Sequence, residues 1–507
     1  MGTLAFGGSD LRAGVIQGRG FRRVDGAFMI VPLRFAPQKD IMNQAASIPG
    51  FARPAFVPEA QAEFETLVAR HPDLEFVDAV VVDLCGTLRG KRLPIGEAHK
   101  LFESGLQLPH SIYLMDARGE MTNPFDRGFG DGDPDGTAWP VPDTIRATWG
   151  EGALRARMFL TLRDDAGEPD PAEPISALER VLESFHATKL TPVCALELEF
   201  YLIDRARVDG GAPQPPLDPR TSTRESTGSV YGLDDLDRFH AFLSSLAEAA
   251  EREGVPVSAT SKEYAPGQFE ANLKHQSNAR HAADHAVLLQ QIVKAAARAN
   301  GFDATFMAKP YADRAGSGLH IHLSLLDANG RNIFDNGTAE GSDRLRHAIG
   351  GLQAAMPESM ALFAPSVNSY RRFQPDMFAP VNRRWGVNNR SAGMRVPAGP
   401  SEARRVEHRV AGADANPYLA LAAVLAGVQH GLENKLDPGA PATGNVSRDP
   451  DLSLPFIIDD ALQRLERASI LPAYFGEETL ALYRETKRIE AQRIRRAIPP
   501  VEYEWYL

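Results

Sequence analysis

Cysteine is scarce in this sequence, which contains only Cys85 and Cys194 and no closely spaced cysteine pair. A disulfide-stabilised scaffold and a zinc ribbon are therefore excluded, and we expect a protein of the reducing cytoplasm. The sequence also lacks an apolar run of roughly 18 residues and a recognisable signal peptide. We therefore expect no membrane association.

Positively charged residues are outnumbered by negatively charged ones. The chain has 55 lysines and arginines against 66 aspartates and glutamates, which gives a net charge of −11. Nucleic-acid binders usually present a basic surface, so we expect no nucleic-acid partner. Hydrophobic residues make up 43% of the chain and charged residues 24%, as in ordinary globular proteins. At 507 residues the chain is long enough for two or more domains.

Composition and periodicity divide the chain into three parts. Residues 1–41 are rich in glycine and arginine, and we expect residues 1–50 to be a disordered tail or the product of an overextended reading frame. Residues 76–94 predict two strands with a turn at Gly86, and residues 105–150 predict a long loop-rich region. Helices are predicted at 60–73, 176–188, 233–253, 280–300, 416–433, 459–467 and 476–498. We expect domains at 51–150 and 151–507.

Two segments that read as strands carry chemically reactive side chains in alternation. Glu197 and Glu199 lie in the first, and His320 and His322 lie in the second, where Ser324 follows on the same face. Because residues i and i+2 of a strand point to one face, each pair should present both side chains together. The glutamates alone are compatible with a solvated strand face, but the apolar neighbours predict an interior strand, where a carboxylate needs a partner.

Two further segments gather charges. Glu263 and Glu270 flank a Pro-Gly turn, which should bring their carboxylates together. Arg405, Glu407 and Arg409 alternate with other residues, and residues 383–397 and 400–410 together carry seven arginines. Exposed strand ends and a basic surface patch are the ordinary alternatives. Taken together, the four segments predict one cavity with carboxylate ligands for Mg²⁺ or Mn²⁺ and arginines for anions.

Eight segments in order resemble the glutamine synthetase family. They are ELEFYL, KEYAPGQFE, AGSGLHIHLSL, NSYRRF, APVN, NNRSAGMRVP, ARRVEHR and ANPYLALAA, and the resemblance extends from about residue 75 to the end of the sequence. It implies an α+β fold, with an N-terminal β-grasp domain and a catalytic domain built on a curved antiparallel sheet flanked by helices. It also implies a dodecamer of two hexameric rings, with each active site between neighbouring subunits.

The resemblance further implies roles for individual residues. Two or three Mg²⁺ or Mn²⁺ ions per site are implied, one held by Glu199, Glu263 and Glu270 and another by Glu197, His320 and Glu407. Glutamate binding is implied for Gly316, Arg372 and Arg409. Contacts to ATP are implied for His322, Ser324, Arg390, Arg395 and Arg405. Direct catalytic roles are implied for Glu263, Arg390 and Arg395.

The sequence departs from the family pattern at the ammonium pocket. An Asp-Gly-Ser-Ser segment is replaced by residues 108–111, a flap glutamate by Phe378 and a glycine-loop asparagine by Ala315. These changes remove anionic groups and add apolar surface, where each buried methylene of a substrate contributes about 0.8 kcal/mol. We therefore expect an organic amine, bound near Pro109, Ala315 and Phe378, as in the similar γ-glutamylpolyamine synthetase branch. The expected reaction joins it to the γ-carboxyl of L-glutamate through γ-glutamyl phosphate.

Several alternatives stay open at the level of sequence. An ordinary glutamine synthetase that uses ammonia and a non-catalytic relative are both compatible with parts of the pattern. The amine itself can be a polyamine, an alkyl monoamine, ethanolamine or an aromatic amine, since the Asp-rich segment 126–135 favours a dication whereas Phe378 and Trp385 favour apolar groups. Asp116, Asp133 and Asp135 are candidates for the base that deprotonates it.

Overall fold

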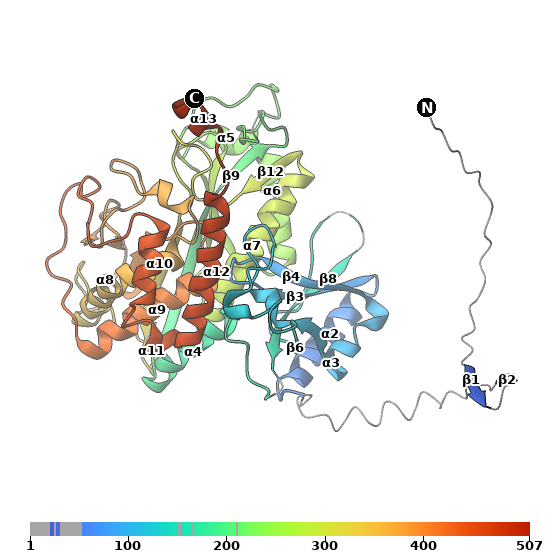
Figure 1. Cartoon of the computed structure of the whole chain (residues 1–507). Helices are drawn as coiled ribbons and strands as arrows, with labels where there is room; N and C mark the ends of the chain where they lie inside the picture. Colours follow the sequence, from blue (N-terminus) through green and yellow to red (C-terminus); the bar gives the residue numbers. More distant parts are fainter. Residues whose placement is uncertain are drawn as a thin grey trace. The chain divides into compact units, whose positions relative to one another are not determined.

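Figure 1 shows the computed structural model of the chain, which describes residues 21–24, 27–30, 53–150, 152, 154–164, 166–208 and 211–507. The chain forms two compact units, Met1–Phe51 and Ala52–Leu507. In the first unit, strands β1 (Phe21–Val24) and β2 (Ala27–Ile30) pair in antiparallel fashion. The rest of the predicted extension, residues 1–50, lies outside the described residues.

A six-stranded mixed sheet occupies the N-terminal part of the second unit. Its strands are β3 (Phe76–Val82), β4 (Leu88–Pro94), β5 (Leu106–Pro109), β6 (Asp135–Pro140), β7 (Arg146–Ala147) and β8 (Arg155–Arg163). The order is β4-β3-β8-β6-β5, with β7 on β8, and β3 and β8 run parallel. Gly86 has a φ of +76° in the turn between β3 and β4, as predicted. Because β8 belongs to this sheet, the sheet extends beyond residue 150. The domain boundary expected at that residue stays a prediction.

An eight-stranded sheet forms the centre of the C-terminal part of the second unit. Its strands are β9 (Thr191–Asp204), β10 (Val257–Lys262), β11 (Gln268–Leu273), β12 (Phe302–Thr305), β13 (Leu319–Leu326), β14 (Trp385–Val387), β15 (Met394–Val396) and β16 (Val406–His408). The order is β10-β11-β9-β13-β16-β15-β14, with β12 also paired to β9, and β14 and β15 are the parallel pair. The mixed first sheet and this curved, largely antiparallel sheet confirm the predicted α+β class.

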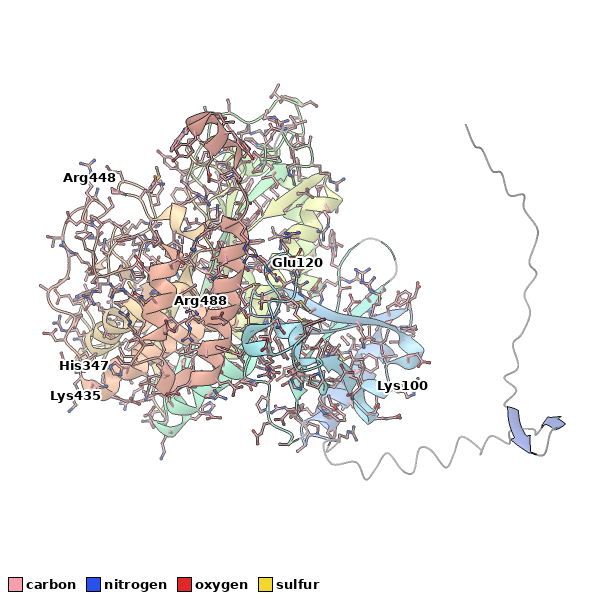
Figure 2. All side chains as sticks on the ribbon, viewed as in Figure 1. Lys100, Glu120, His347, Lys435, Arg448 and Arg488 are labelled. Atoms are coloured by element: carbon pink, nitrogen blue, oxygen red, sulfur yellow. The ribbon has the colours of Figure 1, made fainter. Side chains whose placement is uncertain are left out.

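Helices cover both sheets (Figure 1). They are α2 (Val57–Arg70), α3 (Lys100–Glu103), α4 (Pro174–Ala187), α5 (Leu233–Arg238), α6 (His240–Arg252), α7 (Ala279–Ala299), α8 (Asp343–Phe363), α9 (Pro417–Asn434), α10 (Ile458–Glu466), α11 (Pro472–Phe475), α12 (Glu477–Arg495) and α13 (Pro500–Tyr506). Charged side chains such as those of Lys100, Lys435 and Arg448 lie at the surface (Figure 2). No described helix is long and apolar enough to cross a membrane.

Two helical segments differ from the sequence-based expectation. The predicted helix 233–253 is broken at Phe239, whose ring is buried against Phe269 and Phe302. Packing of this ring therefore overrides the local helical pattern. Helix α8 has no counterpart among the predicted helices, because Pro357 and two adjacent glycines interrupt its periodicity.

The backbones of helices α8 and α9 approach each other closely where the two helices cross. A methyl group on Gly351 would lie 2.0 Å from the Gly427 carbonyl oxygen, and one on Gly431 would lie 2.1 Å from the carbonyl oxygen of His347. Helix α9 is apolar nearly all round, and its first turn is capped by the side chain of Asn416. The glycines therefore allow two backbones to touch in the core of the molecule.

Replacement of Gly351 by alanine should destabilise the protein by about 1–3 kcal/mol, because backbone atoms of α9 would have to move. The measurement is the midpoint of urea unfolding. Gly399→Ala is the matched control, since this exposed glycine has no heavy atom within 4 Å of the added methyl and a φ that alanine can adopt. Equal midpoints for the two variants would contradict the packing argument.

Candidate active site

Four neighbouring strands carry the predicted site residues on one face of the large sheet. Glu270 of β11 stands opposite Glu199 of β9, and Glu197 stands opposite His320 of β13. His322 of β13 in turn stands opposite Glu407 of β16. Since alternate residues of a strand share a face, this register brings the separate sequence segments together, as predicted.

The side chains of this cluster lie close together. His320 Nδ1 is 3.3 Å from Glu197 Oε2 and 3.9 Å from Glu270 Oε2, while His320 Nε2 is 4.0 Å from Glu199 Oε1. Glu199 also accepts a hydrogen bond of 2.8 Å from the Gly318 backbone. The described residues thus place three carboxylates around one buried imidazole.

Glu263 joins the cluster from the turn between β10 and β11. The buried Lys262 donates to the carbonyl oxygens of Glu263 and Ala265, at 3.1 and 2.6 Å. The Gly267 amide donates to Glu225 at 2.6 Å. These contacts fix the turn that holds Glu263.

Burial, reinforced by repulsion between neighbouring carboxylates, dominates the electrostatics of Glu263 and Glu270. Burial, Glu199 and Glu270 raise the pKa of Glu263 to about 8, and burial and Glu197 raise the pKa of Glu270 to about 7. Burial also acts on Glu197, but contacts with two histidines outweigh it and hold the pKa of that carboxyl well below its usual range. At neutral pH the cluster therefore retains protons that a cation can replace.

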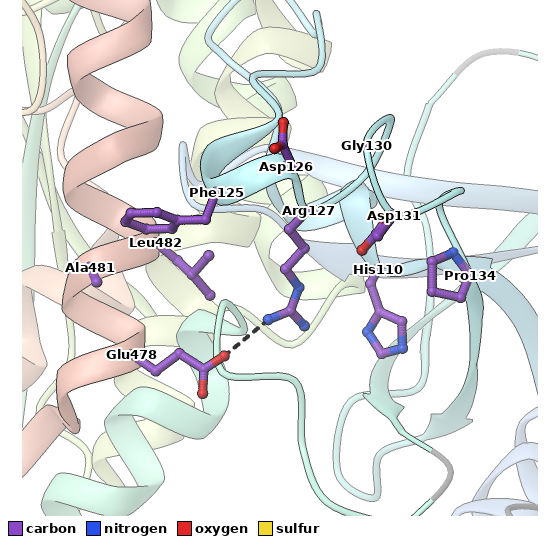
Figure 3. A pocket seen from close by; sticks show the side chains of 10 residues that line it. All are labelled: His110, Phe125, Asp126, Arg127, Gly130, Asp131, Pro134, Glu478, Ala481 and Leu482. Carbon is purple, nitrogen blue, oxygen red and sulfur yellow. Dashed lines mark hydrogen bonds and ion pairs between the residues drawn. The ribbon is translucent and has the colours of Figure 1, made fainter.

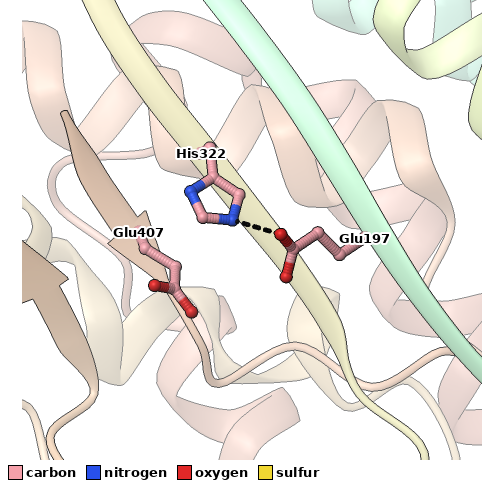
Figure 4. Close-up of side chains that lie close together, drawn as sticks. All are labelled: Glu197, His322 and Glu407. Carbon is pink, nitrogen blue, oxygen red and sulfur yellow. Dashed lines mark ion pairs between the residues drawn. The ribbon is translucent and has the colours of Figure 1, made fainter. Parts of the chain in front are cut away.

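The donor set fits divalent cations. Ligand atoms of Glu197, Glu270 and His320 lie within 4.8 Å of one another, and so do those of Glu197, His322 and Glu407 (Figure 4). Oxygen-rich sets with a single imidazole suit Mg²⁺ or Mn²⁺. This grouping differs from the predicted one, because His322 lies beside Glu407 where His320 was expected. The assignment of each ligand to a particular ion stays a prediction.

Glu407 is held between two arginines. One oxygen forms an ion pair with Arg409, and the other lies 2.9 Å from Arg395 Nη1. Burial raises the pKa of Glu407, but Arg409 and the two nearby histidines lower it more, to about 2. Glu407 therefore remains ionised throughout the physiological pH range.

Arg405 contacts the second histidine. Its Nε donates to His322 Nδ1 at 3.0 Å, so the proton of the neutral ring lies on Nε2, which faces Glu197 Oε1 at 2.9 Å. Ser324 follows two residues later on β13. Arg390 is exposed between β14 and β15, and no contact among the described residues links it to the cluster.

Two of the predicted glutamate-binding residues, Gly316 and Arg372, meet at the glycine loop before β13. A methyl group on Gly318 would lie 3.4 Å from Arg372 Nη2 and 3.6 Å from Glu199 Oε1. One on Gly316 would lie 2.7 Å from Arg372 Cγ, so this loop needs glycine to pack against the arginine. Tyr201 and Gln268 donate to the carbonyl oxygens of residues 315 and 316 and hold the loop in place.

The residues predicted for the amine pocket are distributed more widely. The Phe378 ring is exposed and lies 4.9 Å from the ring of Tyr264, the neighbour of Glu263. Pro109 belongs to the first sheet, where it stands opposite Asp135. Ala315 is buried in the glycine loop. The described contacts within one chain therefore do not unite the three residues.

Two expectations about the amine site were wrong. Trp385 is fully buried and donates to the Gly439 carbonyl oxygen at 3.1 Å, so it offers no surface to an amine. Asp116 cannot serve as a free base, because one oxygen accepts two backbone N–H groups and the other pairs with Arg493 at 2.6 Å. Its carboxylate instead fixes a loop to helix α12.

The Asp-rich segment lines a separate cavity of about 480 Å³ (Figure 3). Asp126 and Asp131 face it together with Arg127, which is 3.2 Å from Glu478 of α12. Asp133 accepts hydrogen bonds from Ser111. The segment therefore combines charges of both signs.

Sequence reasoning missed two polar residues near the site. Lys262 supports the turn that carries Glu263, and Asp414 accepts hydrogen bonds from two serines near Arg372. For Lys262, the signal was its position next to a predicted ligand. Asp414 has no local signal, because its partners lie more than forty positions away in the sequence.

Comparisons with known proteins agree with this geometry. Residues 171–506 match the family model described as the glutamine synthetase catalytic domain. The chain is 40% identical over 445 residues to gamma-glutamylputrescine synthetase of Escherichia coli (strain K12), which covers 88% of this chain and 94% of the relative. It is 32% identical over 441 residues to gamma-glutamylethanolamide synthetase of Streptomyces coelicolor, with 85% and 92% covered. A solved GmaS/ADP complex superposes with a TM-score of 0.75 at 26% identity, covering 87% of this chain and 98% of that chain.

Binding of Mn²⁺ should release protons near neutral pH, because the raised pKa values of Glu263 and Glu270 leave both carboxyls partly protonated there. The affinity should rise as the pH increases from 6 to about 8 and then level off. Calorimetric titration in two buffers of different ionisation enthalpy measures the proton release. The Glu263→Gln variant should release fewer protons than the wild type, and proton release that is the same at pH 6.5 and pH 9 would contradict the expectation.

Proposed function

Since this chain belongs to the glutamine synthetase family, we propose that it is an ATP-dependent ligase that joins the γ-carboxyl group of L-glutamate to an organic amine. The products are a γ-glutamylamide, ADP and phosphate. The observation that carries this proposal is the cluster of carboxylates around His320 beside the buried Arg372 and Arg409. Its similarity to amine ligases over most of both chains supports an amine as the acceptor.

The carboxylate cluster would hold the divalent cations of the reaction. Its members in this proposal are Glu197, Glu199, Glu263, Glu270, His320 and Glu407. When bound, Mg²⁺ or Mn²⁺ supplies charge neutralisation for ATP and the γ-carboxylate, which otherwise repel each other. The chain's own contribution is to hold these carboxylates at fixed positions on adjacent strands.

The arginines divide between the two anionic substrates. Arg372 and Arg409 receive glutamate, because a guanidinium fork matches a carboxylate in geometry and charge, and the backbone of Gly316 lines the same place. Arg405, with His322 and Ser324, receives ATP. Arg390 and Arg395 stabilise the phosphoryl group in transfer, where charge spreads over its oxygens. The resulting γ-glutamyl phosphate is then attacked by the amine.

The aromatic pair Tyr264 and Phe378 is the proposed contact surface for the amine. Both rings are exposed beside Glu263, and aromatic rings attract alkylammonium groups and bury their methylenes. Ala315, in the glycine loop before β13, is a further proposed member of the pocket. Pro109 would complete the pocket from a neighbouring subunit of a dodecamer of two hexameric rings, which we propose assembles in the cytoplasm.

An organic amine should be a better substrate than ammonia. Phosphate release with ATP, Mg²⁺ and glutamate is measured against ammonia, methylamine, ethanolamine, putrescine, spermidine and aniline. Ammonia as the best substrate would favour an ordinary glutamine synthetase, and no release with any amine would favour a non-catalytic relative. Glu263→Ala should abolish the activity, whereas Glu248→Ala, an exposed control on α6, should not.

Removal of the Phe378 ring should weaken amine binding specifically. Phe378→Ala is expected to raise the KM for the preferred amine about tenfold, since apolar contact area is lost, with little change in the KM for ATP. Leu452→Ala removes another exposed apolar side chain and serves as the control. Steady-state kinetics with each substrate varied in turn make the comparison, and an unchanged amine KM would remove Phe378 from the pocket.

A further inference from the structure

Arg372 is a buried cation with few direct partners. Only 3% of the residue is exposed, and its Nη1 donates to the Val410 carbonyl oxygen at 3.2 Å. Its Nε has no hydrogen-bond partner among the described residues. An isolated buried charge is costly, so a guanidinium in this position needs a negative neighbour.

Asp414 is half-buried near this arginine, with its Oδ1 atom shielded from solvent. It lies between β16 and α9, and its Oδ2 accepts hydrogen bonds from Ser369 at 2.6 Å and Ser366 at 3.1 Å. Ser369 begins the short 3₁₀ turn, Ser369–Arg372, that carries Arg372 itself. The carboxylate therefore holds the backbone turn from which the arginine side chain extends.

The second oxygen of Asp414 and the guanidinium of Arg372 both lie beside Gly412. Asp414 Oδ1 has no hydrogen-bond partner among the described residues. A methyl group on Gly412 would lie 2.5 Å from this oxygen and 3.1 Å from Arg372 Nη1, so both groups flank the same glycine. Hydrogen bonds from Gly412 to the Phe363 carbonyl, at 2.9 Å, and from Ala413 to the Ser317 carbonyl, at 3.0 Å, fix this stretch of backbone.

We propose that Asp414 is a positioning residue for glutamate binding, which fixes Arg372 through Ser366 and Ser369 and supplies the charge that balances its guanidinium. The other end of that guanidinium approaches Glu199 and His320, where the substrate carboxylate is proposed to bind. Asp414 itself touches no substrate. The inference rests on the proposed function, because it assigns Arg372 to glutamate.

Charge balance around Arg372 supports this role. The carboxylates that act on Arg372 are those of Glu199 and Asp414. Glu199 is proposed to serve a cation, so its charge is not available to the arginine alone. Burial raises the pKa of Asp414, and the Ser369 hydroxyl and the Arg372 charge oppose that rise. Asp414 is therefore the carboxylate dedicated to Arg372.

The test is the nearly isosteric Asp414→Asn variant, which keeps an oxygen for the serine hydroxyls but removes the charge. We expect the KM for glutamate to rise about tenfold, while the KM for ATP and kcat at saturating glutamate stay within about twofold of the wild type. Calorimetric binding of glutamate to the full-chain protein should weaken in parallel. Unchanged glutamate binding, or equal changes in both KM values, would overturn the inference.

Asp284→Asn is the matched control. Asp284 is more deeply buried than Asp414, accepts a hydrogen bond from the Tyr418 hydroxyl and has one oxygen without a partner among the described residues, but it lies near Arg280 instead of Arg372. This variant should leave the KM for glutamate unchanged. If it raises that KM as much as Asp414→Asn does, the effect is general loss of a buried charge and the inference fails.

A double variant tests whether Asp414 acts on glutamate binding through Arg372 or through a general loss of structure. In an Arg372→Lys background, Asp414→Asn should have little further effect on glutamate binding, because both changes act through one guanidinium. Fully additive effects would refute the coupling. If the wild-type protein neither binds nor converts glutamate, both the proposed function and this inference are refuted. If it binds glutamate but Asp414→Asn does not change that binding, only this inference is refuted.

Discussion

Partial burial of mutually repelling carboxylates is the constraint on which the rest of this structure depends. Burial and the neighbouring carboxylates raise the pKa of Glu263 and Glu270, so a rigid scaffold is needed to keep these groups together. Adjacent strands provide it, because their hydrogen-bond ladders fix side chains at constant spacing. The long strand β9, paired on both sides, carries two of the glutamates in the cluster. A bound divalent cation would offset the unfavourable electrostatic energy of these clustered carboxylates.

The arginines meet the opposite problem, since buried cations need negative partners. Arg395 and Arg409 share Glu407, and Arg405 donates to a histidine instead of a carboxylate. Arg405 therefore makes no direct carboxylate contact among the described residues, whereas the single carboxylate of Glu407 balances only one of the two charges of Arg395 and Arg409. A single face of the sheet consequently offers a strongly anionic region next to a region of moderated positive charge, which suits a metal–phosphate and a carboxylate side by side.

Alternation along strands and the turn at residues 263–270 were sufficient to predict which side chains within each segment share a face, because both are local rules of backbone geometry. The α+β class followed from ordered motifs. Features that depend on contacts between residues far apart in the sequence could not be predicted from it. The orientation of His322 toward Glu407 depends on strand register, the burial of Trp385 on packing from a distant loop, and the break at Phe239 on aromatic contacts. Asp414 could not be found because no local pattern links it with its serines.

The close crossing of α8 and α9 has a consequence for substrate recognition. Helix α8 ends at Phe363, shortly before the turn with Arg372, and α9 begins at Pro417, shortly after Arg409. The Phe363 carbonyl is bonded to Gly412 of the intervening stretch. The two helices therefore anchor the backbone on either side of both arginines. A side chain larger than glycine at position 351 would thus be expected to disturb this stretch of backbone as well as the stability of the fold.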